Sequence, residues 1–153
     1  MVDAPDVYLT AREFVGTPYL DHGRSIDTGL DCIGLPLLVA RTLDLGIVSE
    51  ERYSNSSPDG LIDAHINRKC EKYVLVPGVL CTFKIKGVPS HCGIISKYMD
   101  GLGLIHAWDI VGRVVEHRLT KNWRDRAIDC YKLPLVDYDR VRLRYGLHVI
   151  GNR

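Results

Sequence analysis

Several signals that would assign a broad class of function are missing from the sequence. The longest apolar stretch, residues 35–40, is far shorter than the roughly 20 residues of a membrane-spanning helix. Residues 1–15 carry Asp3 and Asp6 and lack the apolar segment of a signal peptide. The formal net charge is +1 and no block of like charge stands out, so bulk electrostatics do not indicate nucleic-acid binding. We therefore expect synthesis in the cytoplasm, no membrane insertion and no nucleic-acid partner.

The cysteines lack the pattern of a disulfide framework or of a metal site. They are five, an odd number, at positions 32, 70, 81, 92 and 130, which favours a reducing compartment over paired disulfides. No CxxC or HxxxH spacing is present, so we expect no metal and no cofactor. A zinc protein that gathers scattered cysteine and histidine side chains is an alternative, which metal analysis of the pure protein would test.

The order of the predicted elements indicates an α+β fold in a single domain of 153 residues. Helical spacing predicts helices over residues 7–15, 31–45 and 58–70. The period then changes, and alternation predicts five antiparallel strands over 80–85, 91–98, 102–108, 113–118 and 127–133, with a loop over 86–90 and a helical turn over 120–126. The core spans about residues 7–134. The extension, residues 135–153, alternates again and is predicted to be an edge strand or a partner-binding arm.

The stretch Gly29–Leu35, with the sequence GLDCIGL, places a polar and reactive pair at the head of an apolar helix. Asp31 is a good N-cap, since its carboxylate can accept from the free N–H groups of the first turn. Cys32 would then be the first helical residue, where the helix dipole favours the thiolate. Pro36 should remove one backbone hydrogen bond or bend the helix start. The alternative is that Cys32 is simply a small buried hydrophobic residue.

A cysteine nucleophile needs a base within hydrogen-bonding reach and a third group that orients the base. His91 opens one predicted strand and His106 lies near the end of the next. In an antiparallel hairpin these two positions are neighbours, so the two imidazoles are expected side by side. The alternative is that each is a half-buried strand histidine that bonds to a backbone carbonyl. Cys92, the residue after His91, is expected to point to the opposite face, into the core.

The other histidines fall in different contexts. His22, in the loop before Cys32, is suited to shaping a substrate pocket, and Arg24 in the same loop can hold a substrate carboxylate or be an ordinary solvated residue. His65 falls on the apolar side of the predicted third helix, and His148 lies in the tail. His117 lies inside a strand opposite valine and is expected to be exposed.

Four motifs then occur in order: GTPY at 16–19, GLDCIGL at 29–35, HCGI at 91–94 and LIHA at 104–107. Together they resemble the NlpC/P60 family of papain-like cysteine peptidases, which cut the stem peptides of the bacterial cell wall. The resemblance implies a nucleophile helix packed on an antiparallel sheet. It also implies Cys32 as nucleophile, His91 as base and His106 as the residue that orients the base. The resemblance also implies that Tyr19 lines the site near the nucleophile. Together with His22, Arg24 and Asp31, Tyr19 completes the substrate-binding residues that we expect.

Three further features resemble the phage branch of the family: the DCIGL form, with Ile33 in place of the usual serine, the loop over 19–25, and GRVVEHRL at 112–119 with Trp123 and Arg124. Cys92 also replaces the usual aliphatic residue. The branch implies cleavage between D-isoglutamate and a diamino acid, tail proteins of phages or gene-transfer particles as partners, and a final location in the virion or tail. The alternatives are a non-catalytic component of a tail tip and an acyl-transfer enzyme on the same scaffold.

Overall fold

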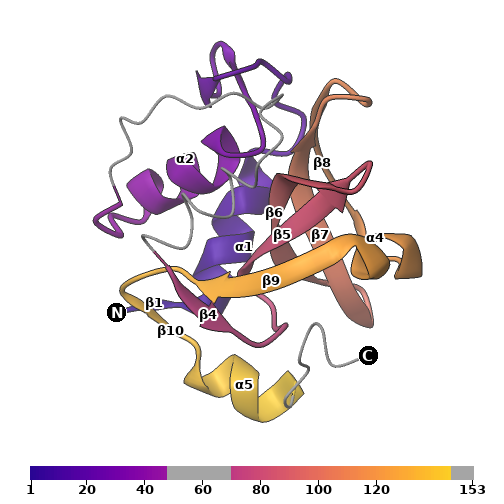
Figure 1. Ribbon diagram of the computed structural model, residues 1–153. Coiled ribbons are helices and arrows are strands. Elements are labelled where there is room, and N and C mark those ends of the chain that lie inside the picture. The colour runs from indigo at the N-terminus through magenta and orange to yellow at the C-terminus, as the bar shows by residue number, and fades with distance from the viewer. Residues whose placement is uncertain (48–69, 146–153) are drawn as a thin grey trace.

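The computed structural model describes residues 1–47 and 70–145, which form a six-stranded antiparallel sheet with helices on both sides (Figure 1). The strand order in the sheet is β4-β9-β5-β6-β7-β8. These strands are β4 (Glu71–Tyr73), β5 (Leu80–Ile85), β6 (Val88–Tyr98), β7 (Gly101–Trp108), β8 (Arg113–Arg118) and β9 (Ala127–Lys132). Strands β5 to β8 follow one another in the sheet as they do in the chain, so this part is a simple meander.

Two short strand pairs and four helices complete the described part of the chain. Strand β1 (Val2–Asp3) pairs in parallel with β10 (Val136–Asp137), and β2 (Arg24–Ser25) forms a small hairpin with β3 (Gly29–Leu30). The helices are α1 (Ala4–Glu13), α2 (Gly34–Thr42), α4 (Lys121–Arg126) and α5 (Asp139–Tyr145). None of the helices within residues 1–47 and 70–145 has the length and apolar character that crossing a membrane requires.

Helices α1 and α2 cover one face of the sheet and enclose the first core. In α1 the Asp3 N–H donates to the Asp6 carboxylate at 2.8 Å, which closes the helix start. Val7 and Ala11, four residues apart on one side of α1, are completely buried. The first core combines these side chains with others from α2 and from the inner strands: Leu35, Val39, Ala40, Cys92, Ile94, Ile105, Ala107 and Val114.

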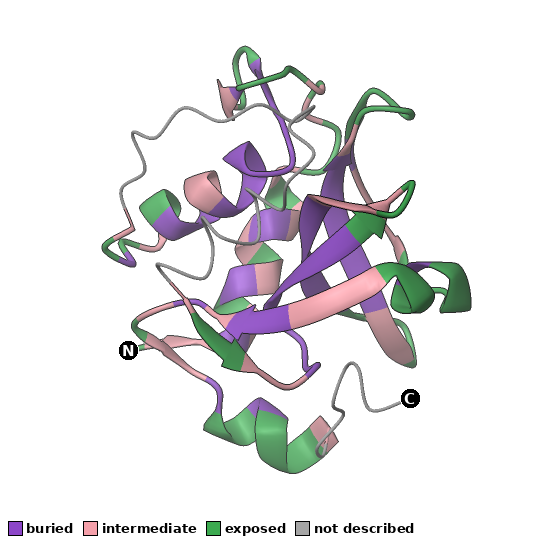
Figure 2. Cartoon of the chain, viewed as in Figure 1, coloured by how far each residue is buried: buried purple, intermediate pink, exposed green. Residues whose placement is uncertain are grey.

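The second core lies on the other face of the sheet, where α4 and α5 pack against it. Its buried members include Phe83, Ile95, Leu104, Trp123, Cys130, Tyr138 and Val141. Because both faces are covered, the middle of the sheet is buried throughout, as Figure 2 shows for β5, β6 and β7. This is why residues 92–96 of β6 form an unbroken buried run instead of alternating between core and solvent.

The predicted α+β class is confirmed, and the five predicted strands are present as β5 to β9. The predicted loop over 86–90 is wrong. Lys86 and Gly87 alone form the turn, with φ of 51° and 77°, as a two-residue hairpin turn of the mirror-image type requires. Pro89 suggested a loop, but β7 pairs with β6 only from Ile94 onward, so this end of β6 tolerates a residue without an N–H. His91 consequently lies inside β6 and does not open it.

Three other expectations differ from the structure or fall outside it. Helix α2 starts at Gly34, not Asp31, and Thr120 occupies the N-cap position of α4 without a side-chain cap bond. The strand predicted in the extension is wrong for 139–145, because Val141 and Tyr145, four residues apart, pack on the second core as one face of helix α5. The predicted helix over 58–70, with His65, and the end of the tail, with His148, lie outside the described residues apart from Cys70.

Candidate active site

Asp31 connects the start of α2 to the loop before it. Its Oδ1 accepts from the backbone N–H groups of Ile33 at 3.1 Å and Gly34 at 2.7 Å, as a capping carboxylate does. Its Oδ2 accepts from the His22 N–H at 2.8 Å, and Arg24 Nη1 lies 3.0 Å from Oδ1. The Asp31 side chain has no exposed surface, and these contacts fix the position of the loop relative to the helix start.

The second glycine of GLDCIGL is required by this close approach of loop and helix. A Cβ on Gly34 would overlap the carbonyl oxygen of Gly23, a backbone atom, and would lie 3.2 Å from Arg24 Nη1. Any side chain at Gly34 would therefore push the loop away from α2. The motif thus serves both the chemistry of Cys32 and the placement of the loop beside it.

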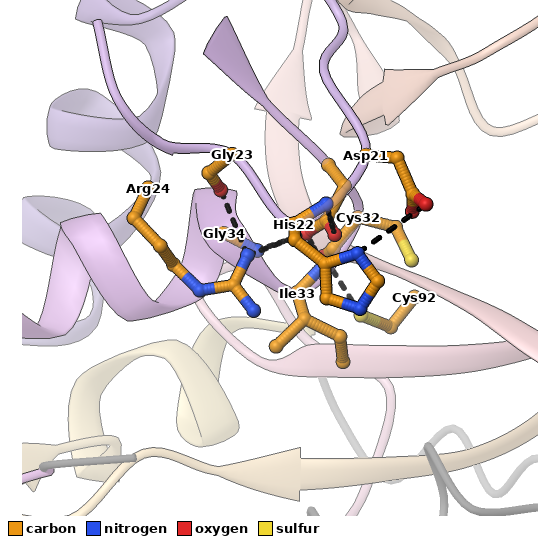
Figure 3. A network of polar contacts seen from close by, with 9 residues as sticks. Asp21, His22, Gly23, Arg24, Cys32, Ile33, Gly34 and Cys92 are labelled. Atoms are coloured by element: carbon orange, nitrogen blue, oxygen red, sulfur yellow. Dashed lines mark hydrogen bonds and ion pairs between the residues drawn. The ribbon is translucent and has the colours of Figure 1, made fainter. Parts of the chain in front are cut away.

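Cys32 lies just before α2, and its carbonyl oxygen has an unusual partner. Pro36 has no N–H to donate to this carbonyl; instead the Cys92 thiol of β6 donates to it at 2.9 Å (Figure 3). The backbone hydrogen bond that Pro36 is predicted to remove is thus absent, and the Cys92 thiol takes the place of the missing N–H donor. Cys92 faces the first core as expected, and there it contacts the segment that holds Cys32.

The surroundings of Cys32 favour ionisation of its thiol. Hydrogen bonding with Cys92, and then with His91, lowers the pKa of the Cys32 thiol below its ordinary value, although burial and the Asp31 charge raise it. The contact with Cys32 and burial raise the pKa of Cys92 well above its ordinary value. Within this pair the thiolate is therefore favoured at Cys32 and the neutral thiol at Cys92. Only 3% of the Cys32 surface and 7% of the His91 surface are exposed.

The structure brings His91 and His106 together, as the predicted hairpin requires. His91 Nε2 lies 2.7 Å from His106 Nδ1, and the rings meet edge to face with centroids 4.9 Å apart. Pairing between β6 and β7 stops at Ile94 and Ile105, which leaves room for the two rings. Gly93 keeps that room free, since a Cβ there would lie 2.9 Å from His106 Cβ.

His106 is completely buried between two tryptophans. It stacks on Trp108, with centroids 5.2 Å apart, and meets the Trp123 ring edge to face at 4.8 Å. Burial, and then the neighbouring His91 and His117, lower the pKa of His106 to about 2. His106 is therefore a neutral hydrogen-bonding group throughout the physiological pH range.

The expectation that His117 is exposed is wrong: the residue is half-buried and extends the row of histidines. His117 Nε2 lies 2.8 Å from His106 Nε2, and His117 Nδ1 lies 2.8 Å from the carbonyl oxygen of Arg118. The signal lies in the register between β7 and β8 and not in the alternation of β8 alone. In the β7–β8 pairing, His106 is opposite Val115, so His117 is its diagonal neighbour on the same face.

Cys32 and the histidines belong to different faces of the sheet. Cys32 and Cys92 are members of the first core. His91 instead contacts Phe83 and Trp123 of the second core, with ring centroids 6.3 and 5.7 Å away. The site therefore forms where the pairing of β6 with β7 stops. At this point side chains from the two faces of the sheet come together.

The remaining predicted binding residues lie in the segment 19–24, which precedes Cys32 in the chain. Tyr19 is partly buried against the first core, and its N–H donates to the Gly112 carbonyl at 2.9 Å. His22 has a left-handed φ of 60° and a half-exposed ring 3.3 Å from the Asp21 carboxylate. A cavity of about 220 Å³ beside α2 has Arg24 in its wall, but its lining does not include Cys32 or the histidines.

Metal ligation is a second possible use of clustered cysteine and histidine side chains. Within residues 1–47 and 70–145, no three His, Cys, Asp or Glu side chains are grouped so that they can hold a metal ion. Both ring nitrogens of His106 face another histidine, so the imidazoles form a hydrogen-bonded row instead of converging on one point.

Two solved structures are similar to this chain in fold. A lipoprotein-like NLP/P60 family protein from Staphylococcus aureus matches with a TM-score of 0.60 and 19% identity over 86% of this chain, which spans 41% of that protein. The P60 domain of an antigen from M. avium subspecies paratuberculosis matches with a TM-score of 0.59 and 17% identity, over 88% of this chain and 96% of that one. The chain has an NlpC/P60 fold. No protein-family model matches the sequence, and no curated protein matches it.

The papain-like NlpC/P60 fold expected from the four motifs is thereby confirmed. Helix α2, which follows Cys32, packs against β6 of the antiparallel sheet, as the resemblance implied. At these identities the likeness is one of fold, and the chemistry has to be argued from the side chains described above.

Proposed function

We propose that the protein is a cysteine peptidase that hydrolyses peptide bonds in the stem peptides of bacterial peptidoglycan. The observation that carries the proposal is the Cys32 thiol of lowered pKa beside His91, whose far nitrogen bonds to His106. This is the set of groups that a thiol nucleophile needs: a base in reach and a neutral residue that holds the base. The NlpC/P60 fold of the two solved neighbours supports the class of substrate.

The reaction follows from the placement of the groups. The Cys32 thiolate attacks the carbonyl carbon, and the Cys32 backbone N–H, ahead of the first turn of α2, is one donor to the developing oxyanion. His91 Nδ1–H gives its proton to the amide nitrogen, the C–N bond breaks, and the amine leaves a thioester on Cys32. His91 then takes a proton from water, which attacks the thioester. The acid product leaves, and the thiolate and the protonated His91 are restored.

The finer assignments rest on the sequence motifs. We propose that the scissile bond joins D-isoglutamate to a diamino acid, and that the protein acts within the tail of a phage or a gene-transfer particle. Tyr19, His22 and Arg24 would form the substrate side of the site. Arg24 suits a substrate carboxylate, because 29% of its side chain is exposed while the ion pair with Asp31 holds it in place.

The test is incubation with purified muropeptides, followed by mass analysis of the fragments. We expect a mass gain of one water across the cleaved bond, loss of that activity in Cys32→Ala, and full turnover in Cys70→Ala. Both variants should melt close to the wild-type temperature. If Cys32→Ala cuts as well as the wild type, Cys32 is not the nucleophile. Products joined to an added amine instead of water would indicate acyl transfer, and a folded wild type that leaves every muropeptide intact would favour a structural role in a tail tip.

A further inference from the structure

We propose that His117 is a positioning residue of the active site, which holds His106, and through it His91, in one tautomer. In that tautomer His91 directs a lone pair at Cys32. The proposal rests on the proposed peptidase function for its consequence in catalysis, while the tautomer itself can be measured without any substrate.

The row of histidines ends on the outside at the carbonyl oxygen of Arg118. A carbonyl oxygen only accepts, so His117 Nδ1, 2.8 Å away, must carry a proton. In its neutral form His117 has one N–H, which is then on Nδ1, so His117 Nε2 is an acceptor. His106 Nε2, 2.8 Å from it, must then be the donor.

The same constraint applies to the two inner rings, His106 and His91. Since the N–H of neutral His106 is on Nε2, its Nδ1 is an acceptor, and His91 Nε2, 2.7 Å away, donates to it. The N–H of neutral His91 is thereby held on Nε2, and its Nδ1 keeps a lone pair on the side of the ring away from His106. This is the nitrogen that accepts a proton from the Cys32 thiol or from the attacking water. A backbone carbonyl of β8 thus determines the tautomer of the base through two intervening rings.

The surroundings of the row keep water from replacing these bonds. Trp123 lies against all three rings, with centroids 5.7 Å from His91, 4.8 Å from His106 and 6.0 Å from His117. Trp108 stacks on His106 from the other side. A buried His106 N–H that loses its acceptor has no solvent partner, so without His117 it favours the other tautomer. The proton of His106 would then be on Nδ1 and would oppose the N–H of His91.

The experiment compares His117→Leu, which removes the acceptor, with His117→Gln, whose side-chain oxygen can accept from His106. The first measurement is ¹⁵N NMR of the imidazoles, which distinguishes a protonated from an unprotonated ring nitrogen. We expect His106 to carry its proton on Nε2 in the wild type and in His117→Gln, and a mixed or reversed state in His117→Leu. Arg113→Gln, an exposed change on the same strand, is the control and should leave the spectrum unchanged.

The second measurement is kcat/KM on one muropeptide. A wrong tautomer costs about 10⁴-fold in serine peptidases when the orienting residue contacts the base itself. His117 is one ring further away, so we expect a loss of roughly ten- to a hundredfold in His117→Leu, in kcat and not in KM. His117→Gln should recover most of this loss at an unchanged melting temperature.

The outcomes separate the two proposals. An unchanged His106 tautomer in a folded His117→Leu, or full activity in that variant, would overturn the role of His117. A spectrum that changes as expected, in a protein that cuts no muropeptide, would support the row and overturn the peptidase function instead.

Discussion

Asp31→Asn should destabilise the protein strongly, although it keeps the size and shape of the side chain. The asparagine oxygen can still accept from the N–H groups of Ile33 and Gly34. Its NH₂ group, however, would face the His22 N–H, which now donates to Asp31 Oδ2 at 2.8 Å. The asparagine NH₂ group and the His22 N–H would then oppose each other as two donors. Water cannot separate them, because the side chain at position 31 has no exposed surface.

The magnitude follows from these contacts. A buried donor without an acceptor costs about 1–3 kcal/mol. The bonds that survive lose the charge of the carboxylate, and a charged acceptor is worth roughly twice a neutral one. The ion pair to Arg24 also disappears, but 29% of the Arg24 side chain is exposed, so water partly replaces it. We expect a loss of about 3 kcal/mol in the free energy of unfolding. In a protein of this length that lowers the melting temperature by roughly 6–12 °C.

The assay is thermal and urea unfolding of Asp31→Asn beside Asp27→Asn, an exposed change in the same loop. The control should stay within about 0.5 kcal/mol of the wild type. A normal melting temperature for Asp31→Asn, together with a raised KM for muropeptides, would refute the reasoning and make Asp31 a substrate-binding residue.

Two further changes probe the site directly. Cys92→Val removes the donor that most lowers the pKa of Cys32, so the midpoint of Cys32 alkylation by iodoacetamide should move to higher pH. Cys130→Val, a buried change in the second core, should leave that midpoint in place, and equal midpoints in the two variants would contradict the role of Cys92. Gly93→Ala would put a Cβ 2.9 Å from His106 Cβ, and a shift of the ring by about 1 Å should lower kcat/KM roughly a hundredfold. Retained activity would mean that β7 can move without disturbing His106.

The pairing of His91 with His106 could be predicted from the sequence because it depends only on a local hairpin. Consecutive strands joined by a short turn place the start of one beside the end of the next, whatever the rest of the fold does. The fold class could be predicted for a similar reason, since strands β5 to β9 have readable patterns of apolar residues.

The role of His117 could not be predicted with the same rules. Alternation with valine indicated a solvent-facing side chain, but Trp108 from β7 and Trp123 from α4 cover that part of the sheet. The cover comes from a helix that follows β8, and no local pattern shows where that helix will pack. The contact between Cys92 and Cys32 depends likewise on how α2 meets the sheet, which is a property of tertiary packing.

The division of the site between the two faces of the sheet has a consequence for folding. Cys32 is ordered by packing of the first core, and the base is ordered by Phe83 and Trp123 of the second. An intermediate in which only one of the two cores has packed would order either the Cys32 thiol or the row of imidazoles. It would not hold the two groups in contact. On the proposed function, hydrolysis would require both layers to be packed, and a variant that loosens either layer would lose activity.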